Sequence, residues 1–263
     1  MKVTVQFFSY LRELTSNRDN LRAISADGTI QVCESTALEG KKQFDVWTQG
    51  LEQPKSVPFE ADVNRRGLSL SVTGKWLSVK SEGKPTLVYD LQSRESSPIY
   101  KVKGSASGAE ISPDDRFLVI AQQFGVVGYF DLQNGVALPN LKELESFWAW
   151  GLSVAFSRDG RLVASGNESG IISVWETTSR KQICRLVTGQ GEIVALDFFP
   201  DGRRLAAGGN GCVLICDVET EQELIRLPTL DTQVTCVDVN DQGAAVCAIT
   251  NGGHIYYWNG ATK

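Results

Sequence analysis

Short stretches of alternating apolar and polar residues recur along the C-terminal half of the chain. The pattern is plainest in LSVAFSRDGRLVASGNESGIISVWE (152–176), IVALDFFPDGRRLAAGGNGCVLICDV (193–218) and VTCVDVNDQGAAVCAITNGGHIYYWN (234–259). Each stretch alternates, reaches a turn with Gly, continues as a short apolar segment, reaches a second Gly turn and alternates again. Alternation with a period of two predicts strands, and glycine between such runs predicts tight turns. Each stretch is therefore predicted to form three consecutive antiparallel strands.

Weaker copies of the same unit precede these three. Residues 68–91 and 109–132 show it, and segments 3–8, 21–28 and 29–35 show it faintly. We take one residue near the end of each unit as its anchor, which gives Cys33, Tyr89, Phe130, Trp175, Cys216 and Trp258. The spacings between these anchors are 56, 41, 45, 41 and 42 residues. Four of the five spacings fit a repeat of about 40–45 residues, which indicates a ring of repeated small sheets.

The best of these units resembles a known repeat. SGNESGIISVWE (165–176) is similar to the third-strand signature of the WD-repeat family, with Trp175 in the Trp position and Glu176 in place of the usual Asp. FSRDG (156–160) and ISPDD (111–115) resemble the first turn of that family's repeat. The resemblance implies an all-β fold, a WD-repeat β-propeller of about six blades with four antiparallel strands each. The chain has one histidine, so most of the family's His-Asp-Ser-Trp hydrogen-bond network is missing, and we expect apolar packing to hold the blades together.

We expect a single domain over residues 1–263, with a loop at 49–61. The approximate blade limits are 1–48, 62–104, 105–147, 148–188, 189–230 and 231–263. The outer strand of the first blade is predicted at about 42–48, and the first or the last blade is expected to be incomplete. Two ways of completing the ring stay open: residues 2–8 add a strand to the last blade, or a partner chain does so by β-augmentation.

Composition narrows the class of partner. The formal net charge is −5 and the sequence pI about 5.1, and this acidic balance argues against nucleic acid as the partner. No apolar run approaches the length of a membrane span, and the N-terminus lacks the features of a signal peptide. The six cysteines lie mostly inside apolar runs, so we expect buried, reduced thiols. These observations predict a cytoplasmic protein, with a nuclear location left open and the membrane disfavoured.

The sequence offers little chemistry for an active site. His254 is the only histidine, and no G-x-S-x-G motif is present. Cys212 and Cys216 are four residues apart, but no second Cys/His pair has zinc-site spacing. We therefore expect no catalytic residues, no metal, no cofactor and no enzymatic activity. Arg65-Arg66-Gly67 resembles part of the Phe-Arg-Arg-Gly motif of lipid-binding propellers, although Asn64 replaces the Phe.

The remaining candidates are residues for binding a partner. In propellers, the loops that enter the inner strands and those between second and third strands meet at one rim of the central channel. Aromatic residues and arginine are typical of binding hot spots. The rim candidates are Trp148, Trp150, Arg65, Arg66, Glu192, Gln233, Glu168 and Asn210. The predicted function is a non-catalytic protein–protein interaction scaffold, a subunit of a multiprotein complex. The alternative is a ligand- or lipid-sensing propeller, and an enzyme built on a propeller ranks last.

Overall fold

The structure is a computed structural model that describes residues 21–24, 30–36, 42–48, 53–58, 63–81, 84–93, 95–103, 106–122, 126–142, 150–230 and 233–260. Every regular element in these segments is a β-strand, and the strands form six antiparallel sheets that we number in chain order. None of the described residues belongs to a helix that could cross a membrane. The predicted all-β architecture of about six blades is confirmed.

Sheets 1 to 5 have four strands each and sheet 6 has three, always in sequence order. Sheet 1 contains β1 (Leu21–Ile24), β2 (Ile30–Thr36), β3 (Lys42–Thr48) and β4 (Lys55–Pro58). Sheet 2 contains β5 (Val63–Leu70), β6 (Trp76–Ser81), β7 (Thr86–Asp90) and β8 (Tyr100–Val102). Sheet 3 contains β9 (Ala106–Ile111), β10 (Phe117–Gln122), β11 (Val126–Asp131) and β12 (Val136–Lys142).

The second half repeats this plan. Sheet 4 contains β13 (Gly151–Phe156), β14 (Leu162–Asn167), β15 (Ile171–Glu176) and β16 (Gln182–Val187). Sheet 5 contains β17 (Ile193–Phe198), β18 (Arg204–Gly209), β19 (Cys212–Asp217) and β20 (Gln222–Pro228). Sheet 6 contains β21 (Val234–Val239), β22 (Ala245–Thr250) and β23 (Ile255–Asn259).

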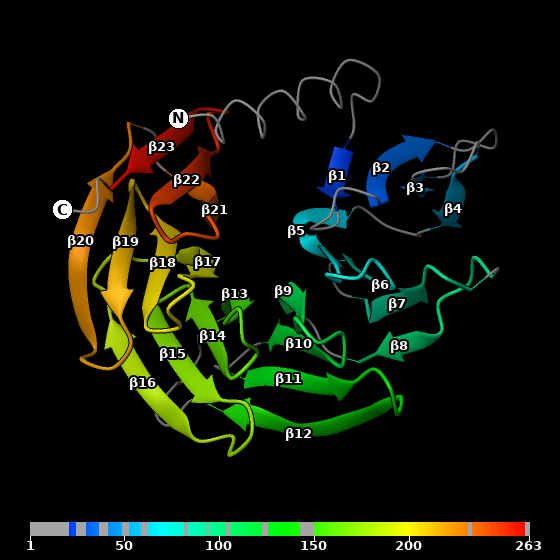
Figure 1. Cartoon of the computed structure of the whole chain (residues 1–263), viewed down its shortest axis with the longest axis horizontal. Helices are drawn as coiled ribbons and strands as arrows, with labels where there is room; N and C mark the ends of the chain where they lie inside the picture. Colours follow the sequence, from blue (N-terminus) through cyan, green and yellow to red (C-terminus); the bar gives the residue numbers. More distant parts are fainter. Residues whose placement is uncertain are drawn as a thin grey trace.

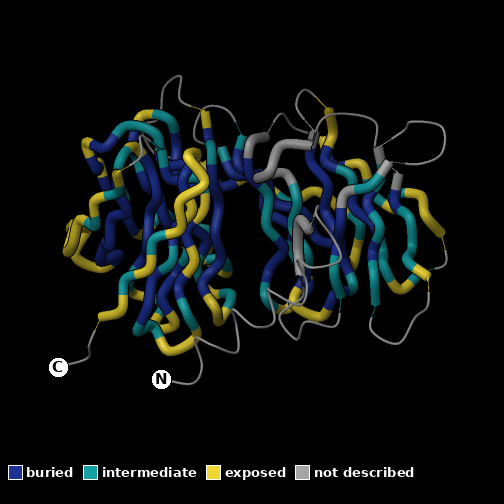
Figure 2. Tube along the Cα trace, turned by 90° about the horizontal axis from the view of Figure 1, so that it is seen from above, coloured by how far each residue is buried: buried dark blue, intermediate teal, exposed yellow. Residues whose placement is uncertain are grey.

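The sheets stand side by side around a common centre (Figure 1). The first strands of neighbouring sheets contact each other in the series β1, β5, β9, β13, β17 and β21, so they are the inner strands of the ring. Sheet 6 and sheet 1 lie at the two ends of this series, and the described strands of these two sheets do not meet. Buried segments run along the middle of the sheets, and exposed ones gather at the turns and outer edges (Figure 2).

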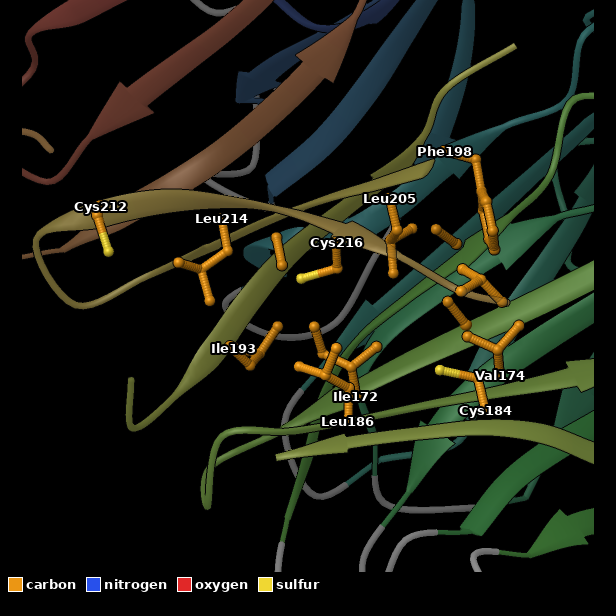
Figure 3. Close-up of a cluster of buried hydrophobic side chains, with 14 residues drawn as sticks. Ile172, Val174, Cys184, Leu186, Ile193, Phe198, Leu205, Cys212, Leu214 and Cys216 are labelled. Atoms are coloured by element: carbon orange, nitrogen blue, oxygen red, sulfur yellow. The ribbon is translucent and has the colours of Figure 1, made fainter. Parts of the chain in front are cut away.

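Apolar clusters between consecutive sheets hold the ring together. The cluster between sheets 4 and 5 is drawn in Figure 3, where Ile172 and Val174 of β15 lie opposite Leu214 and Cys216 of β19. Comparable clusters join sheets 1 and 2, 2 and 3, 3 and 4, and 5 and 6. A single sheet cannot cover both of its apolar faces, and stacking against a neighbour removes them from water.

Five of the six predicted anchors lie where the repeat requires, near the end of a third strand. Trp175, for example, pairs with Val163 of the second strand, and the same register recurs at Tyr89, Phe130, Cys216 and Trp258. In sheet 1 this position belongs to Trp47, which pairs with Gln31 and precedes Tyr89 by 42 residues. The prediction of Cys33 as an anchor is wrong, because Cys33 lies in the second strand.

The first unit is therefore displaced by one strand from its predicted place. Residues 42–48, predicted as the outer strand, are the third strand, and β4 lies inside the predicted loop 49–61. In the sequence of β4, Lys55 and Ser56 precede the buried Val57 and Pro58 follows it, so the segment shows no apolar and polar alternation that would predict a strand. Proline is tolerated at the end of an edge strand. The predicted strand at 2–8 lies outside the described residues.

All six cysteines are free. Cys33, Cys184, Cys212 and Cys216 are buried, as predicted, whereas Cys247 is half-buried and Cys236 is exposed. Cys216 occupies the anchor position of its sheet and packs in the cluster of Figure 3. Burial raises the pKa of the Cys216 thiol to about 12, so this sulfur behaves as an apolar group.

Candidate partner-binding rim

Antiparallel pairing brings two kinds of turn to one end of sheets 4, 5 and 6. Residues that precede the inner strands lie beside residues that follow the second strands, as the pairing of Gly151 with Asn167 shows in sheet 4. We call this end the upper rim. Its members are the predicted residues Trp150, Glu168, Glu192, Asn210 and Gln233, together with Asn251.

Trp150 is held in place through its backbone. Its N–H donates to Glu168 Oε1 at 3.1 Å, and the N–H of Glu168 donates to the Trp150 carbonyl at 3.0 Å. The side chain of Trp150 is nevertheless 44% exposed. Trp150 thus exposes a large aromatic side chain to solvent at the rim, while two hydrogen bonds hold its backbone in place.

Sheets 5 and 6 are joined at the same rim. The side-chain amide of Gln233 donates to Glu192 Oε2 at 2.9 Å, and the N–H of Asn251 donates to the Gln233 carbonyl at 2.9 Å. Asn210 lies over Gly191, since a Cβ on that glycine would stand 2.9 Å from Asn210 Nδ2. These contacts position one carboxylate group, that of Glu192, and three amide side chains along one edge.

Sheets 4 and 5 also meet closely there. Gly170, in the turn after β14, has φ +75°, and a Cβ added to it would lie 2.7 Å from the carbonyl oxygen of Gly191. Glycine is required by both the left-handed backbone and the contact. Below them, the amide of buried Gln190 donates to the Cys212 carbonyl at 2.9 Å. The upper rim of sheets 4 to 6 is therefore a packed surface and not a set of free loops.

The other predicted rim residues do not join this group in the described structure. Arg65 and Arg66 lie within β5, past the start of the strand, and sheet 3 separates their sheet from Trp150. Trp148 lies outside the described residues. The structure thus brings together Trp150 with Glu168 and Glu192 with Gln233, while the two arginines belong to a different part of the ring.

A second polar group, inside the ring, is not apparent from motif reading. Ser69, Glu110, Asp197 and Asp238 occupy equivalent positions of four inner strands, each paired with the third residue of the neighbouring second strand. The Ser69 hydroxyl accepts the N–H of Ile111 at 3.1 Å. Aligning the repeats in columns would have revealed the series, since a polar residue recurs in an otherwise apolar strand.

The two carboxylates of this series repeat the same contact. Asp197 Oδ2 accepts the N–H of Val239 at 2.7 Å, and the carboxyl group of Glu110 accepts the N–H of Phe156. One inner strand is thereby bonded to the next by a side chain. Ala155 stands at the equivalent position of β13 and makes no such bond.

Burial controls the ionisation of these carboxyl groups. It raises the pKa of Glu110 to about 8, and that of Asp197 to about 7, because an ion in the ring loses hydration. The N–H of Val239 opposes the shift at Asp197, as does Arg158, whose guanidinium lies 3.9 Å from Asp197 Oδ2. Asp238 adds a neighbouring negative charge, and burial raises its pKa as well.

The described residues hold no cluster of three or more His, Cys, Asp and Glu side chains with the geometry of a metal site. Cys212 and Cys216 pack in the cluster between sheets 4 and 5. His254 is exposed, next to the turn between β22 and β23. At the upper rim, the exposed aromatic residue is Trp150.

Comparisons with known proteins agree with the fold. The family model for the WD domain, G-beta repeat, matches residues 150–176 and 181–217. Among curated proteins, the chain is similar to the Mus musculus Target of rapamycin complex subunit LST8, at 24% identity over 152 residues, 57% of this chain and 46% of that protein. It is also similar to the Homo sapiens U3 small nucleolar RNA-associated protein 18 homolog, at 30% identity over 179 residues, 62% of this chain and 31% of that protein.

The chain matches less than half the length of either relative. A third similar protein is the Dictyostelium discoideum Periodic tryptophan protein 2 homolog, at 26% identity over 112 residues, 41% of this chain and 12% of that protein. The matched repeats cover sheets 4 and 5, where the sequence pattern is also clearest. Six antiparallel sheets are arranged around a ring, and WD repeats match in two of them, so the chain contains WD repeats and has the architecture of the WD-repeat β-propellers.

Proposed function

We propose that the chain is a non-catalytic scaffold subunit of a protein complex and binds a partner protein through the upper rim. One observation carries the proposal: Trp150 is exposed on a backbone held by Glu168. A large aromatic side chain has few rotatable bonds and, on a fixed backbone, loses little conformational entropy on binding, and such residues dominate the energetics of protein interfaces. The proposal assigns no catalytic role to the chain.

The names of two relatives support this class of function. The mouse relative is named as a subunit of the target of rapamycin complex, and the human one as a protein associated with U3 small nucleolar RNA. Assembly with other macromolecules is thus the common theme, and fold alone would not establish it. Six free thiols agree with a reducing compartment, and we place the complex in the cytoplasm.

The test is recovery of partners on a tagged full-length chain, with Trp150→Ala made alone and together with Trp148→Ala. Ile183→Ala is the matched control, because Ile183 is 47% exposed but lies on the outer strand β16. We expect Trp150→Ala to reduce a stoichiometric partner by about tenfold or more, equivalent to about 1.4 kcal/mol. The control should retain the partner, and both variants should unfold near the wild-type temperature.

An unchanged partner set in the Trp150→Ala variant would contradict the assignment of the rim. A large fall in unfolding temperature would mean that Trp150 serves packing and not binding. If the wild-type chain is a monomer without enriched proteins, the scaffold role fails. Flotation with phosphoinositide vesicles would then test the ligand- or lipid-sensing alternative.

A further inference from the structure

Positive charge is distributed unequally between the two ends of sheets 4 to 6. We call the end opposite the upper rim the lower rim. It holds the turns between first and second strands and those between third and fourth strands. Its cationic residues are Arg158, Arg161, Arg180, Lys181, Arg203 and Arg204. The described turns of the upper rim contain two carboxylates, those of Glu168 and Glu192, and no Lys or Arg.

Several arginines of the lower rim have a carboxylate partner within the chain. Arg161 Nε lies 2.6 Å from Asp159 Oδ2, and Arg203 Nε lies 2.7 Å from Asp217 Oδ2. Exposed ion pairs of this kind contribute little to stability, but they balance the charge on both sides. A charged partner at the lower rim would have to displace them.

The two carboxylates of the upper rim have no such counterion. Glu168 Oε1 accepts the N–H of Trp150, and Glu192 Oε2 accepts the side-chain amide of Gln233. Among the described residues, no group donates to the second oxygen of either carboxylate, and no Lys or Arg forms an ion pair with them. Both side chains are half-buried, so salt screens their charges less than those of fully exposed groups. The upper rim therefore carries negative charge that the described side chains leave unbalanced.

The aromatic residue of the upper rim differs from those at the opposite end. Four aromatic rings lie beneath a cation of this chain, 4.3 to 5.4 Å from the ring centroid, in the pairs Lys75–Trp76, Arg116–Phe117, Arg180–Tyr129 and Arg204–Phe199. Each of these cations comes from the lower rim or from the same end of sheets 2 and 3. Trp150 is 44% exposed, and no Lys or Arg of the described structure lies over its ring. Since the face of an indole attracts cations, Trp150 offers a cation site to another molecule.

The loop that carries Glu192 also contains a buried acceptor without a donor. Gln190 is 8% exposed and lies between two turns of the rim, because its Nε2 donates to the Cys212 carbonyl and the adjacent Gly191 contacts Gly170. No described group donates to Gln190 Oε1. A buried polar atom without a partner costs free energy. The loop therefore favours a ligand that is rich in N–H donors.

We propose that the upper rim binds a basic segment of the partner protein, whose Lys or Arg side chains contact Trp150, Glu168 and Glu192. Arginine fits best, because its planar guanidinium stacks on an aromatic face and its edge carries five N–H donors. One such cation lies over the indole of Trp150, beside the carboxylate that holds the backbone of this residue, and another meets Glu192. The inference rests on the proposed scaffold role and specifies the chemistry of the partner at the same rim.

Charge argues against the other kinds of occupant. An acidic peptide, a nucleic acid or a phosphoinositide headgroup would bring negative charge to carboxylates that are already unbalanced, and like charges across an interface are unfavourable. The residues that precede Trp150 and Gln233 in the sequence, 143–149 and 231–232, contain no Lys or Arg. These two connections of the chain therefore have no cation to place on the rim.

Recovery of the partner on the tagged full-length chain tests the inference, with Glu168→Gln and Glu192→Gln made together. Glutamine keeps a side-chain oxygen that can accept from Trp150 and from Gln233, so the variant loses two charges and retains its hydrogen bonds. The control removes two carboxylates at the lower rim, Glu176→Gln with Glu219→Gln. We expect the rim variant to bind the partner about tenfold more weakly or worse, and the control to change affinity by less than about twofold.

A synthetic probe tests the chemistry without the natural partner. The probe is a fluorescein-labelled peptide of Gly and Ser with Arg at every third position, titrated with the full-length chain and followed by fluorescence anisotropy. We expect its affinity to fall about tenfold in the Glu168→Gln, Glu192→Gln variant and again between about 50 and 200 mM salt. The same peptide with Glu in place of Arg should not bind.

The failure of this inference differs from the failure of the scaffold role. A partner that is lost from Trp150→Ala but retained by the Glu168→Gln, Glu192→Gln variant would overturn the inference and leave the scaffold role intact. Absence of any enriched protein on the wild-type chain would overturn both. If the glutamine variant unfolds at a lower temperature than wild type, the wild-type complex decides: an affinity that is equal at about 50 and 200 mM salt overturns the inference.

A different occupant would also be visible. Lys2, Arg12 and Arg18 near the N-terminus are cations of this chain outside the described residues. If replacing all three by Gln in the full-length chain raises its affinity for the Arg peptide, the chain covers its own rim and the inference is overturned. Unchanged affinity supports a basic segment from the partner.

Discussion

A matched pair of isoleucines tests the difference between covered and uncovered faces directly. Ile172 and Ile255 occupy the same position of third strands, in β15 and β23. Ile172 is 1% exposed against sheet 5, whereas Ile255 has no sheet against it among the described residues. Replacing each by alanine removes the same three carbon groups from the same local backbone. Any difference between the two losses in free energy of unfolding then measures the contribution of packing against the neighbouring sheet.

The expected magnitudes follow from the buried surface. Three carbon groups at about 0.8 kcal/mol each give about 2.4 kcal/mol of transfer free energy for Ile172. The cavity left between two packed sheets increases the loss to about 3–4 kcal/mol. Ile255 is mostly exposed and leaves no closed cavity, so its alanine variant should lose only about 1 kcal/mol. The difference in free energy of unfolding should therefore be about 2–3 kcal/mol.

Urea unfolding of the full-length variants, followed by tryptophan fluorescence, measures this difference. The midpoints should shift with little change in the slope against urea, since the surface exposed on unfolding is nearly the same. Ile172→Val should fall between wild type and Ile172→Ala, with a loss of about 1 kcal/mol. If Ile255→Ala loses as much free energy as Ile172→Ala in the isolated chain, the outward face of sheet 6 is covered and the reasoning is refuted.

Two further variants test the ring interior and the upper rim. The raised pKa of Asp197, about 7 against an ordinary 3.8, means that its contribution to stability is complete below about pH 4 and is lost as the pH rises through 7. Asp197→Asn keeps an acceptor for the N–H of Val239, so it should match wild type near pH 4 and exceed it by about 1–3 kcal/mol near pH 8; unfolding free energies with the same difference at both pH values would contradict this. Gly170→Ala should lose about 2–3 kcal/mol from its positive φ and its contact with Gly191, whereas Gly189→Ala, with open space around it, should lose only about 1 kcal/mol. Equal falls in unfolding temperature for the two alanine variants would show that the contact between sheets 4 and 5 contributes nothing to stability.

The sequence predicts the repeat well where both packing and signature agree. Trp175 and Trp258 combine a bulky anchor with clean alternation, and their sheets lie where expected. The pattern does not identify Trp47 as the anchor of sheet 1, because its pairing partner Gln31 is polar. Cys33, an apolar residue nearby in the sequence, is taken as the anchor instead. The regular spacing of 42 residues from Trp47 to Tyr89 would have corrected the first unit.

The rim is only partly predictable, for a geometric reason. Alignment of the repeats places Trp150 beside Glu168 because both follow from strand register. The position of Arg65 and Arg66 depends on where β5 starts, and the irregular pairing between Val63 and Leu68 hides that boundary in the sequence. The inner acceptors cannot be recognised from one repeat, because each is an isolated polar residue until the four sheets are compared.

Arg158 of sheet 4 contacts sheet 6, although sheet 5 lies between these two sheets in the ring. From the first turn of sheet 4, its guanidinium donates to the Val239 carbonyl at 2.6 Å and to Asp241 Oδ1 at 3.1 Å, both in sheet 6. Repeat proteins change length in evolution by duplication and loss of units, which is easy where each unit contacts only its neighbours. Between sheets 4 and 6, gaining or losing one unit would separate Arg158 from its acceptors. The number of repeats in this part of the ring should therefore vary less among homologous chains than the number elsewhere.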